Sequence, residues 1–328
     1  MLSLPSRKAE LAGFAGLTVL SFLLSRSGGM FLFFAVPLGL IYRLLGFRWF
    51  FPAAGAVLVL TVLLAGGENI EGALSSAAPF LGIRIGIPLI LIAGLFFLLA
   101  GDLIPLRGVY RFLLFSGLLA LGGLPLFIRL FENPEFQEYL KAQAAFMDSF
   151  FQSQDPGGFS GGLFFSDPEA LAVFRETYLR SFVPVLGFLV LITWTLSEAV
   201  AARLLVRLGR GAGDKKGRRP ISLAGFRTPL VLIWPVIGFG FLILVDIFFP
   251  LGTAGCLVWN GGLVLLLIYG IQGAGLIQFF LNRLRMHRFI QVCVFILLGA
   301  LLFRPGIGSF LLILVPAFGL SEHWIRYR

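Results

Sequence analysis

Residues 182–246 read FVPVLGFLVLITWTLSEAVAARLLVRLGRGAGDKKGRRPISLAGFRTPLVLIWPVIGFGFLILVD. Two apolar segments flank a basic loop, residues 203–228, and each segment is long enough for a membrane-spanning helix. The loop carries eight basic residues against one acid, Asp214. Short basic loops beside hydrophobic spans stay on the cytoplasmic side of a membrane, because positive charge resists translocation. This loop therefore predicts the orientation of the helices on either side of it.

The whole chain has the composition of a membrane protein. Its 328 residues are 58% hydrophobic and 13% charged, whereas charged residues make up about a quarter of soluble domains. The formal net charge of +10 does not indicate nucleic-acid binding, because the basic residues concentrate in short loops between apolar segments. We therefore expect a lipid bilayer, and no nucleic acid, as the main partner of the chain.

Hydrophobic runs bounded by charges or by Gly and Pro clusters predict an all-α integral membrane protein, a polytopic bundle of about ten transmembrane helices. The first two and last two runs are short, and they could form hairpins that do not fully cross. An even number of crossings fits the charge bias, with both termini in the cytoplasm of a bacterial inner membrane. The predicted spans are residues 10–25, 29–45, 49–66, 77–100, 109–131, 181–205, 229–249, 254–281, 287–303 and 306–320.

This topology divides the chain into three parts. An N-terminal five-span half (residues 1–131) and a C-terminal five-span half (181–328) flank an extracytoplasmic insert (132–180). The insert places apolar residues from Phe136 to Phe151 at three- and four-residue spacing, which predicts an amphipathic helix. That helix lies on the outer membrane interface or packs on protein. The sequence SDPE at 166–169 is typical of a helix start that leads into the sixth span.

Three of the ionisable side chains inside predicted spans stand out, because a charge there needs a partner, a cavity or an interface. Arg84 and Asp246 come to a similar depth, which predicts an ion pair or a common polar cavity that binds a ligand or an ion. A snorkelling Asp246 is the alternative. Glu198 lies about one turn before Arg203. It is therefore a snorkelling or salt-bridged acid, or else a residue that couples to protons or ions.

The eighth predicted span carries polar side chains next to small residues. Tyr269 and Gln272 are candidates to line a binding site or to bond across helices. Gly273 lies in a thin surface that another backbone could approach closely. In the first span, Ala12 and Gly16 predict a second helix-association face, used within the chain, by a membrane partner protein or by a second copy of the chain.

Motifs of nucleotide-binding and metal-dependent enzymes are missing from the sequence. It contains no Walker-type loop, no HExxH motif, and no His, Cys and Asp residues at the spacing of a metal site. The serine in GFSGG (residues 158–162) stands in a glycine-rich stretch that is typical of a loop. Its two cysteines give no disulfide framework. We therefore predict no catalytic residue, no metal ion and no cofactor, and a protein that is not an enzyme.

The C-terminal third contains three distinctive stretches: RTPLVLIW (residues 227–234), YGIQG with FFLNR (269–273 and 279–283), and GLSEHW (319–324). Together they resemble the YybS-like family of predicted multipass bacterial membrane proteins, whose function is unknown. That family is similar in fold to the substrate-binding membrane components of energy-coupling-factor vitamin importers. Those components dock a partner protein through small residues on their first helix. The resemblance implies the same docking role for Ala12 and Gly16.

Three functions stay open after this reasoning. Small-molecule binding or transport is favoured by the polar residues inside spans, by the Pro and Gly kinks and by the resemblance. A non-transporting scaffold would recruit partner proteins through its surface segments. A secondary transporter would arrange two sets of five spans as inverted repeats. We take the first as the working hypothesis.

Overall fold

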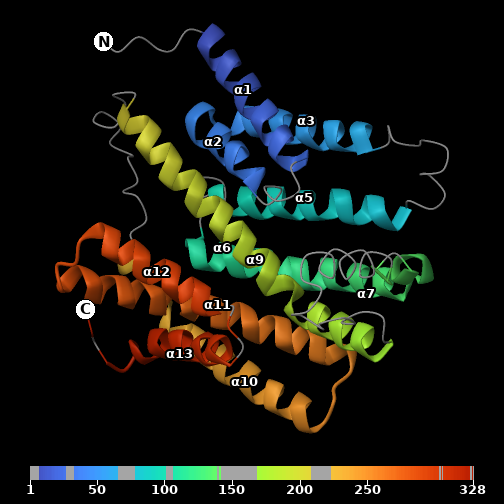
Figure 1. Ribbon diagram of the computed structural model, residues 1–328, viewed down its shortest axis with the longest axis vertical. Helices are drawn as coiled ribbons and strands as arrows, with labels where there is room; N and C mark the ends of the chain where they lie inside the picture. The colour runs from blue at the N-terminus through green and yellow to red at the C-terminus, as the bar shows by residue number, and fades with distance from the viewer. Residues whose placement is uncertain are drawn as a thin grey trace, which may run out of the picture. The chain divides into compact units, whose positions relative to one another are not determined.

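Helices make up most of the described residues in the computed structural model, and those residues contain no strand (Figure 1). The structure describes residues 7–26, 33–65, 78–100, 106–138, 140–141, 168–207, 223–302, 304, 306–325 and 327. The chain forms two compact units, Met1–Gly213 and Asp214–Arg328, which we call unit 1 and unit 2 and describe separately. The boundary between them falls inside the basic loop. The sixth predicted span therefore packs with the first five, instead of joining the C-terminal half that the sequence suggested.

Unit 1 is built around the short helix α2, Ala35–Leu45. Its residues Ala35, Leu38 and Ile41 are fully buried, and helices α1, α3, α5 and α9 surround it. Gly46 follows α2 with φ +95° and lets the chain turn directly into α3. The elements of unit 1 are α1 (Arg7–Arg26), α2, α3 (Phe47–Ala65), α5 (Ala78–Leu99), α6 (Gly108–Leu118), η3 (Leu119–Gly123), α7 (Leu124–Glu132) and α9 (Pro168–Arg207).

Two long helical stretches complete unit 1. The π-helical turn η3 joins α6 to α7, so that residues 108–132 form one continuous helix across the glycine pair Gly122-Gly123. Helix α9 has 40 residues, which is about 60 Å, or twice the hydrocarbon thickness of a bilayer. It begins at Pro168, where the sequence predicted a helix start. Most of the predicted insert, including its amphipathic helix beyond residue 141, lies outside the described residues.

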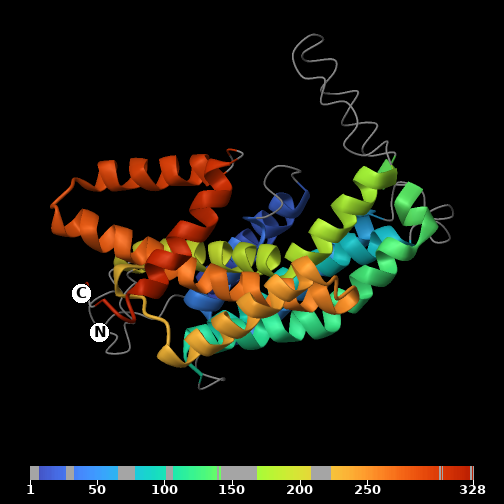
Figure 2. The same cartoon turned by 90° about the horizontal axis from the view of Figure 1, so that it is seen from below.

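Unit 2 is organised around helix α11. Helix α13 packs along it, α10 forms a hairpin with it, and α12 packs against α13 (Figure 2). Helix α12 has no buried residue. Before α10, the chain passes through two short 3₁₀ turns, the first of which packs against α11. The elements of unit 2 are η4 (Leu223–Gly225), η5 (Leu230–Leu232), α10 (Ile233–Phe248), α11 (Thr253–Arg283), α12 (Arg288–Leu302) and α13 (Ile307–Ser321).

The helices fit a membrane protein. Four of them are long and apolar enough to cross a bilayer: Gly108–Glu132, Ala172–Leu205, Leu230–Phe248 and Thr253–Arg283. Helices also lie in the six other predicted spans, but α2 has 11 residues and α12 and α13 have 15 each. These correspond to about 16 Å and 22 Å, less than the hydrocarbon thickness of about 30 Å. Apolar runs in the sequence thus located the helices, and the ten crossings stay a prediction.

Candidate functional site

The predicted contact between Arg84 and Asp246 cannot be compared directly with the structure. Arg84 lies in α5, but its side chain is outside the described residues, so its pairing with Asp246 stays a prediction. Asp246 is buried near the end of α10. Its carboxylate accepts hydrogen bonds from the Leu251 backbone N–H and from Trp259 Nε1, both at 2.8 Å. These bonds close the turn between α10 and α11 and give the buried charge polar partners.

The polar side chains of unit 2 meet around Gln272 in the middle of α11. Its Oε1 accepts from the Thr228 backbone N–H at 3.0 Å and from the Thr228 hydroxyl. Its Nε2 donates to Glu322 Oε2 at 2.8 Å. Arg227 Nε lies 3.7 Å from Glu322 Oε1. Tyr269 and His323 lie beside these residues. We call the six residues the Gln272 cluster: Arg227, Thr228, Tyr269, Gln272, Glu322 and His323.

The direction of each hydrogen bond fixes the proton on His323. The Gln272 Oε1 atom can only accept, so the Thr228 hydroxyl must donate to it. The Thr228 oxygen therefore accepts from His323 Nε2, 3.1 Å away. This arrangement requires a proton on Nε2 in the neutral ring and leaves Nδ1 as the position that an additional proton would occupy. Burial lowers the pKa of His323, and the charge of Glu322 raises it by a smaller amount.

Tyr269 brings unused hydrogen-bonding capacity to this cluster. Its ring packs edge-on against His323, with the ring centroids 5.8 Å apart, and the residue is 1% exposed. The hydroxyl lies toward Thr228, but no hydrogen bond of good geometry reaches it from the described residues. A buried hydroxyl without a partner is unfavourable by about 1–3 kcal/mol. The sequence nominated Tyr269 and Gln272 as ligand-binding candidates, and the structure places both in one cluster.

Close backbone contact between α11 and α13 positions the cluster. A β-carbon at Gly273 would overlap the carbonyl of Val315, and one at Gly319 would overlap the carbonyl of Tyr269. Glycines at both positions let the two backbones touch. This contact sets the C-terminal end of α13, and hence Glu322 and His323, beside Gln272. The helix-association residue predicted in α11 thus lies at the closest approach of these two helices.

Sequence reasoning did not nominate Thr228, Glu322, His323 or Arg227 as site residues. All four lie in the stretches 227–234 and 319–324, which carried the family resemblance together with 269–273. The structure brings these three stretches into one place. The signal that could have identified the cluster is the presence of these three stretches in one chain, because stretches that share a distinctive pattern can lie next to one another in the fold.

The comparisons with known proteins return nothing. No family model, curated protein or solved structure matches the chain. The resemblance to the YybS-like family therefore stays a proposal, and the function has to be argued from the geometry of the site. Among the described residues, no group of three or more His, Cys, Asp or Glu could hold a metal ion.

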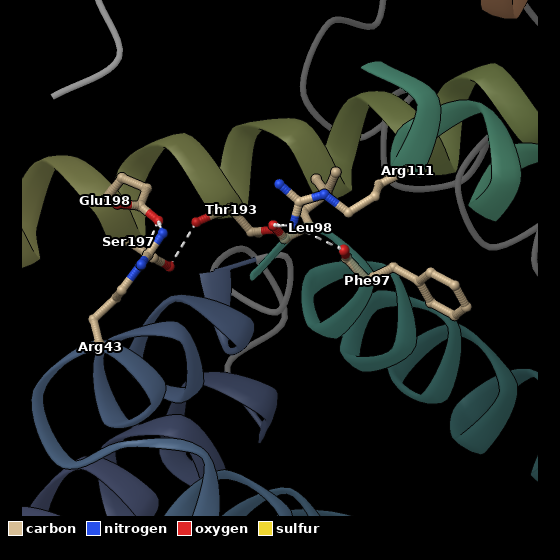
Figure 3. A network of polar contacts seen from close by, with 7 residues as sticks. All are labelled: Arg43, Phe97, Leu98, Arg111, Thr193, Ser197 and Glu198. Atoms are coloured by element: carbon tan, nitrogen blue, oxygen red, sulfur yellow. Dashed lines mark hydrogen bonds and ion pairs between the residues drawn. The ribbon is translucent and has the colours of Figure 1, made fainter. Parts of the chain in front are cut away.

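Unit 1 contains a second polar network, between α2, α5, α6 and α9 (Figure 3). Glu198 of α9 forms an ion pair with Arg43 of α2, with 2.6 Å from Arg43 Nε to Glu198 Oε1. Ser197 donates to the carbonyls of Thr193 and Val36, at 2.7 and 3.2 Å. Glu198 is thus a salt-bridged acid, but its partner is Arg43, 155 residues away, whereas the sequence had suggested the nearby Arg203.

The same network anchors the end of α5. Arg111 of α6 is buried and donates through Nη1 to the Leu98 carbonyl at 2.6 Å. The last carbonyls of a helix lack partners within the helix and carry partial negative charge, so a guanidinium is a favourable cap. Arg111 therefore holds α6 to α5, and the Arg43–Glu198 pair holds α2 to α9. We assign them a structural role.

The Arg43–Glu198 pair should contribute measurably to stability. Its side chains are only 22% and 25% exposed, so solvent screens the pair less than a surface ion pair. We expect Arg43→Gln and Glu198→Gln each to lower the free energy of unfolding by about 1–2 kcal/mol. The double variant should lose less than the sum, because both changes remove the same contact. Thermal unfolding in detergent measures these values, with exposed Arg48→Gln as the matched control.

The face of α1 that carries Ala12 and Gly16 packs against no other helix of the described residues. Ala12 and Gly16 are exposed, and nothing lies within 4 Å of a β-carbon at Gly16. The predicted association through this face can therefore involve lipid, a partner or a second copy, but no packed helix of the described residues. Helix α1 instead contacts α2 and α3 through other positions, including buried Ser21, which donates to the Phe34 carbonyl at 2.6 Å.

Proposed function

We propose that the chain crosses a bacterial inner membrane ten times, with both termini and the basic loop in the cytoplasm. The proposal is supported by a helix in every predicted span and by the concentration of basic residues in alternate connections. The helices α2, α12 and α13 would then cross with the help of flanking residues or of local thinning of the bilayer.

A labelling experiment tests this topology. In a cysteine-free background, Lys216→Cys should react with a membrane-permeant maleimide in intact cells and be protected from an impermeant one, because the basic loop would lie inside. A cysteine introduced at Glu71, in a predicted outer loop, is the control and should react with both reagents. Reaction of the Lys216→Cys variant with the impermeant reagent would place the loop outside and reject the topology.

We further propose that the protein binds or transports a small molecule, and that the Gln272 cluster is its binding site. The observation that carries this proposal is the buried hydroxyl of Tyr269, which lies toward Thr228 among five polar or charged side chains and makes no hydrogen bond of good geometry with the described residues. Polar groups inside membrane helices are expensive and are commonly functional. A bound ligand that accepts a hydrogen bond from this hydroxyl would supply the partner that the described residues do not.

The chemistry of the cluster indicates the class of ligand. The Tyr269 hydroxyl donates one hydrogen bond, and Arg227, half-exposed and charged, lies on the other side of Glu322. A small molecule with a carbonyl, carboxylate or ring-nitrogen acceptor would complement these donors. The chain beside the site, residues 223–232, is not α-helical until Ile233.

Tyr269→Phe separates a ligand role from a structural one. The hydroxyl has no hydrogen bond of good geometry to lose, so the variant should unfold within about 1 kcal/mol of the wild type, or be slightly more stable. Ligand retention should fall by about tenfold, the effect of losing one buried hydrogen bond to a ligand. Native mass spectrometry of protein released from its own membranes measures the retained small molecule, and thermal unfolding measures stability.

Two results would reject the proposal. One is wild-type protein that carries no small molecule in any preparation. The other is a Tyr269→Phe variant that retains a bound molecule as well as the wild type does. In either case, a stable partner protein that copurifies with both would favour the scaffold function, for which the exposed face at Ala12 and Gly16 is the available surface.

A further inference from the structure

The turn that joins α11 to α12 carries an exposed basic surface at one end of unit 2 (Figure 1). Arg283 ends α11, Arg288 begins α12, and Arg285 stands between them. All three are exposed, and we call them the arginine triplet. No ion pair joins the triplet to an acidic side chain in the described chain. Asp246 and Glu322, the two acids in the described part of unit 2, are both buried. The charge of the triplet is therefore not neutralised there.

The backbone of this turn is strained at Arg285. Its φ is +54°, in the left-handed region that favours glycine. The Arg285 N–H donates to the Asn282 carbonyl at 3.0 Å. The next N–H, of Met286, donates to the Leu281 carbonyl at 3.1 Å. These two bonds form a Schellman motif, in which glycine is the usual residue at this position. Glycine would remove the strain together with the guanidinium, and strain of this kind commonly marks a functional site.

Hydrogen bonds from α12 hold the turn in this shape. Gln291 Nε2 donates to the Asn282 side-chain oxygen at 2.9 Å and to the Met286 carbonyl at 3.0 Å. His287 Nδ1 accepts from the Phe289 backbone N–H at 3.3 Å and so caps the start of α12. The arginine triplet is therefore mounted on a fixed backbone. Donors that are held in place before binding lose less entropy when a ligand arrives.

Apolar side chains alternate with the arginine triplet on the same turn. Leu284, Met286 and Phe289 are 67%, 37% and 71% exposed. Guanidinium groups beside exposed apolar side chains complement an amphiphile, whose anionic headgroup adjoins hydrocarbon. Nucleic acid or an acidic protein segment would satisfy the charges but would leave much of this apolar surface in water. The mixture of the two kinds of side chain favours a lipid.

We propose that the turn at residues 283–288 is a binding site for an anionic phospholipid of the surrounding bilayer. The arginine triplet supplies the donors for the phosphate oxygens of the headgroup, a group that guanidinium binds in bidentate geometry. The positive end of the α12 dipole adds to this attraction. The three apolar side chains contact the start of the acyl chains. The site goes beyond the binding function proposed for the Gln272 cluster and shares no residue with it.

Lipid binding by the full-length protein in a neutral detergent tests this site. Phosphatidylglycerol and phosphatidylcholine are titrated in parallel, and native mass spectrometry counts the bound lipids. Phosphatidylcholine has a phosphate but no net charge. Each basic residue near an anionic surface favours binding about fivefold, so the wild type should prefer phosphatidylglycerol by at least about tenfold. Soluble glycerol phosphate, which lacks acyl chains, should not displace the lipid at equal concentration.

Two triple variants compare the site with total charge. Replacement of the whole arginine triplet by glutamine should abolish the preference for phosphatidylglycerol. Replacement of Arg48, Arg107 and Arg203 by glutamine removes the same charge from exposed positions in unit 1 and should leave the preference unchanged. Lysine at all three triplet positions keeps the charge and should keep most of the preference. Thermal unfolding without lipid checks that each variant is folded.

Arg285→Gly separates backbone strain from lipid binding. Glycine adopts the left-handed conformation without strain, so the midpoint of thermal unfolding in lipid-free detergent should rise by about 2 °C. The preference for phosphatidylglycerol should fall by about fivefold, the effect of one basic residue. A gain in stability together with a loss of lipid is the result expected of a residue kept strained for binding.

Three results would reject the lipid site. The wild type might show no preference for phosphatidylglycerol and copurify with nucleic acid or an acidic protein instead. The triplet variant might keep the wild-type preference. The two triple variants might lose the preference equally, which would mean that lipid responds to total charge alone. Ligand retention at the Gln272 cluster is measured on a different variant, Tyr269→Phe, so the failure of either proposal leaves the other intact.

Discussion

Addition of one methyl group at Gly273 should separate α11 from α13. A β-carbon there would overlap the carbonyl of Val315, which is backbone and cannot rotate away. The helices must move apart, and the packing of α13 and the tail contacts at Gln272 would weaken together. We expect Gly273→Ala to lower the free energy of unfolding by about 3 kcal/mol, the upper part of the range for overpacked cores. Thermal or denaturant unfolding in detergent measures the loss.

Gly270→Ala is the matched control for this substitution. It lies one turn earlier on α11, and its β-carbon would meet only Pro316 Cγ at 3.7 Å, an ordinary van der Waals distance. Alanine also favours helix over glycine by about 1 kcal/mol. The control should therefore be as stable as the wild type or slightly more stable. Equal losses at Gly270 and Gly273 would contradict the close backbone contact.

Gln272→Leu should have a comparably large effect for an electrostatic reason. Leucine fills a similar volume but removes the acceptor of the Thr228 N–H and hydroxyl and one donor to the Glu322 carboxylate. Buried groups that lose their partners are unfavourable by about 1–3 kcal/mol each, and more when charged. We expect a loss of about 3–5 kcal/mol, measured by the same unfolding assay.

Gln278→Leu, on the same helix, is the control for the amide. Gln278 Oε1 accepts one hydrogen bond, from the Ala224 backbone N–H at 3.0 Å, and it binds no carboxylate in the described structure. Its loss should lower the free energy of unfolding by about 1 kcal/mol. If Gln278→Leu matched Gln272→Leu, the buried carboxylate would not be the dominant cost, and the Gln272 cluster would lose its special place in unit 2.

The positions of the helices were readable from the sequence to within a few residues. The seventh and eighth predicted spans, 229–249 and 254–281, correspond to helical residues 230–248 and 253–283. The reason is that apolar runs in a membrane protein must satisfy their backbone polar groups internally, and a helix does so within one segment. In the second predicted span, 29–45, helix α2 covers residues 35–45, and residues 29–32 lie outside the described part of the chain.

The sequence by itself determined that this is a helical chain suited to a membrane, where its helices lie, and that Tyr269, Gln272 and Gly273 deserved notice. Tertiary structure alone decided the partners: Arg43 for Glu198, Trp259 for Asp246, and the tail residues Glu322 and His323 around Gln272. The physical reason lies in the helices themselves. Because apolar side chains can face either lipid or protein, the pattern of apolar residues does not indicate which face of a helix turns inward. The rotation of each helix and the choice of its neighbours are therefore set by packing contacts such as those at Gly273.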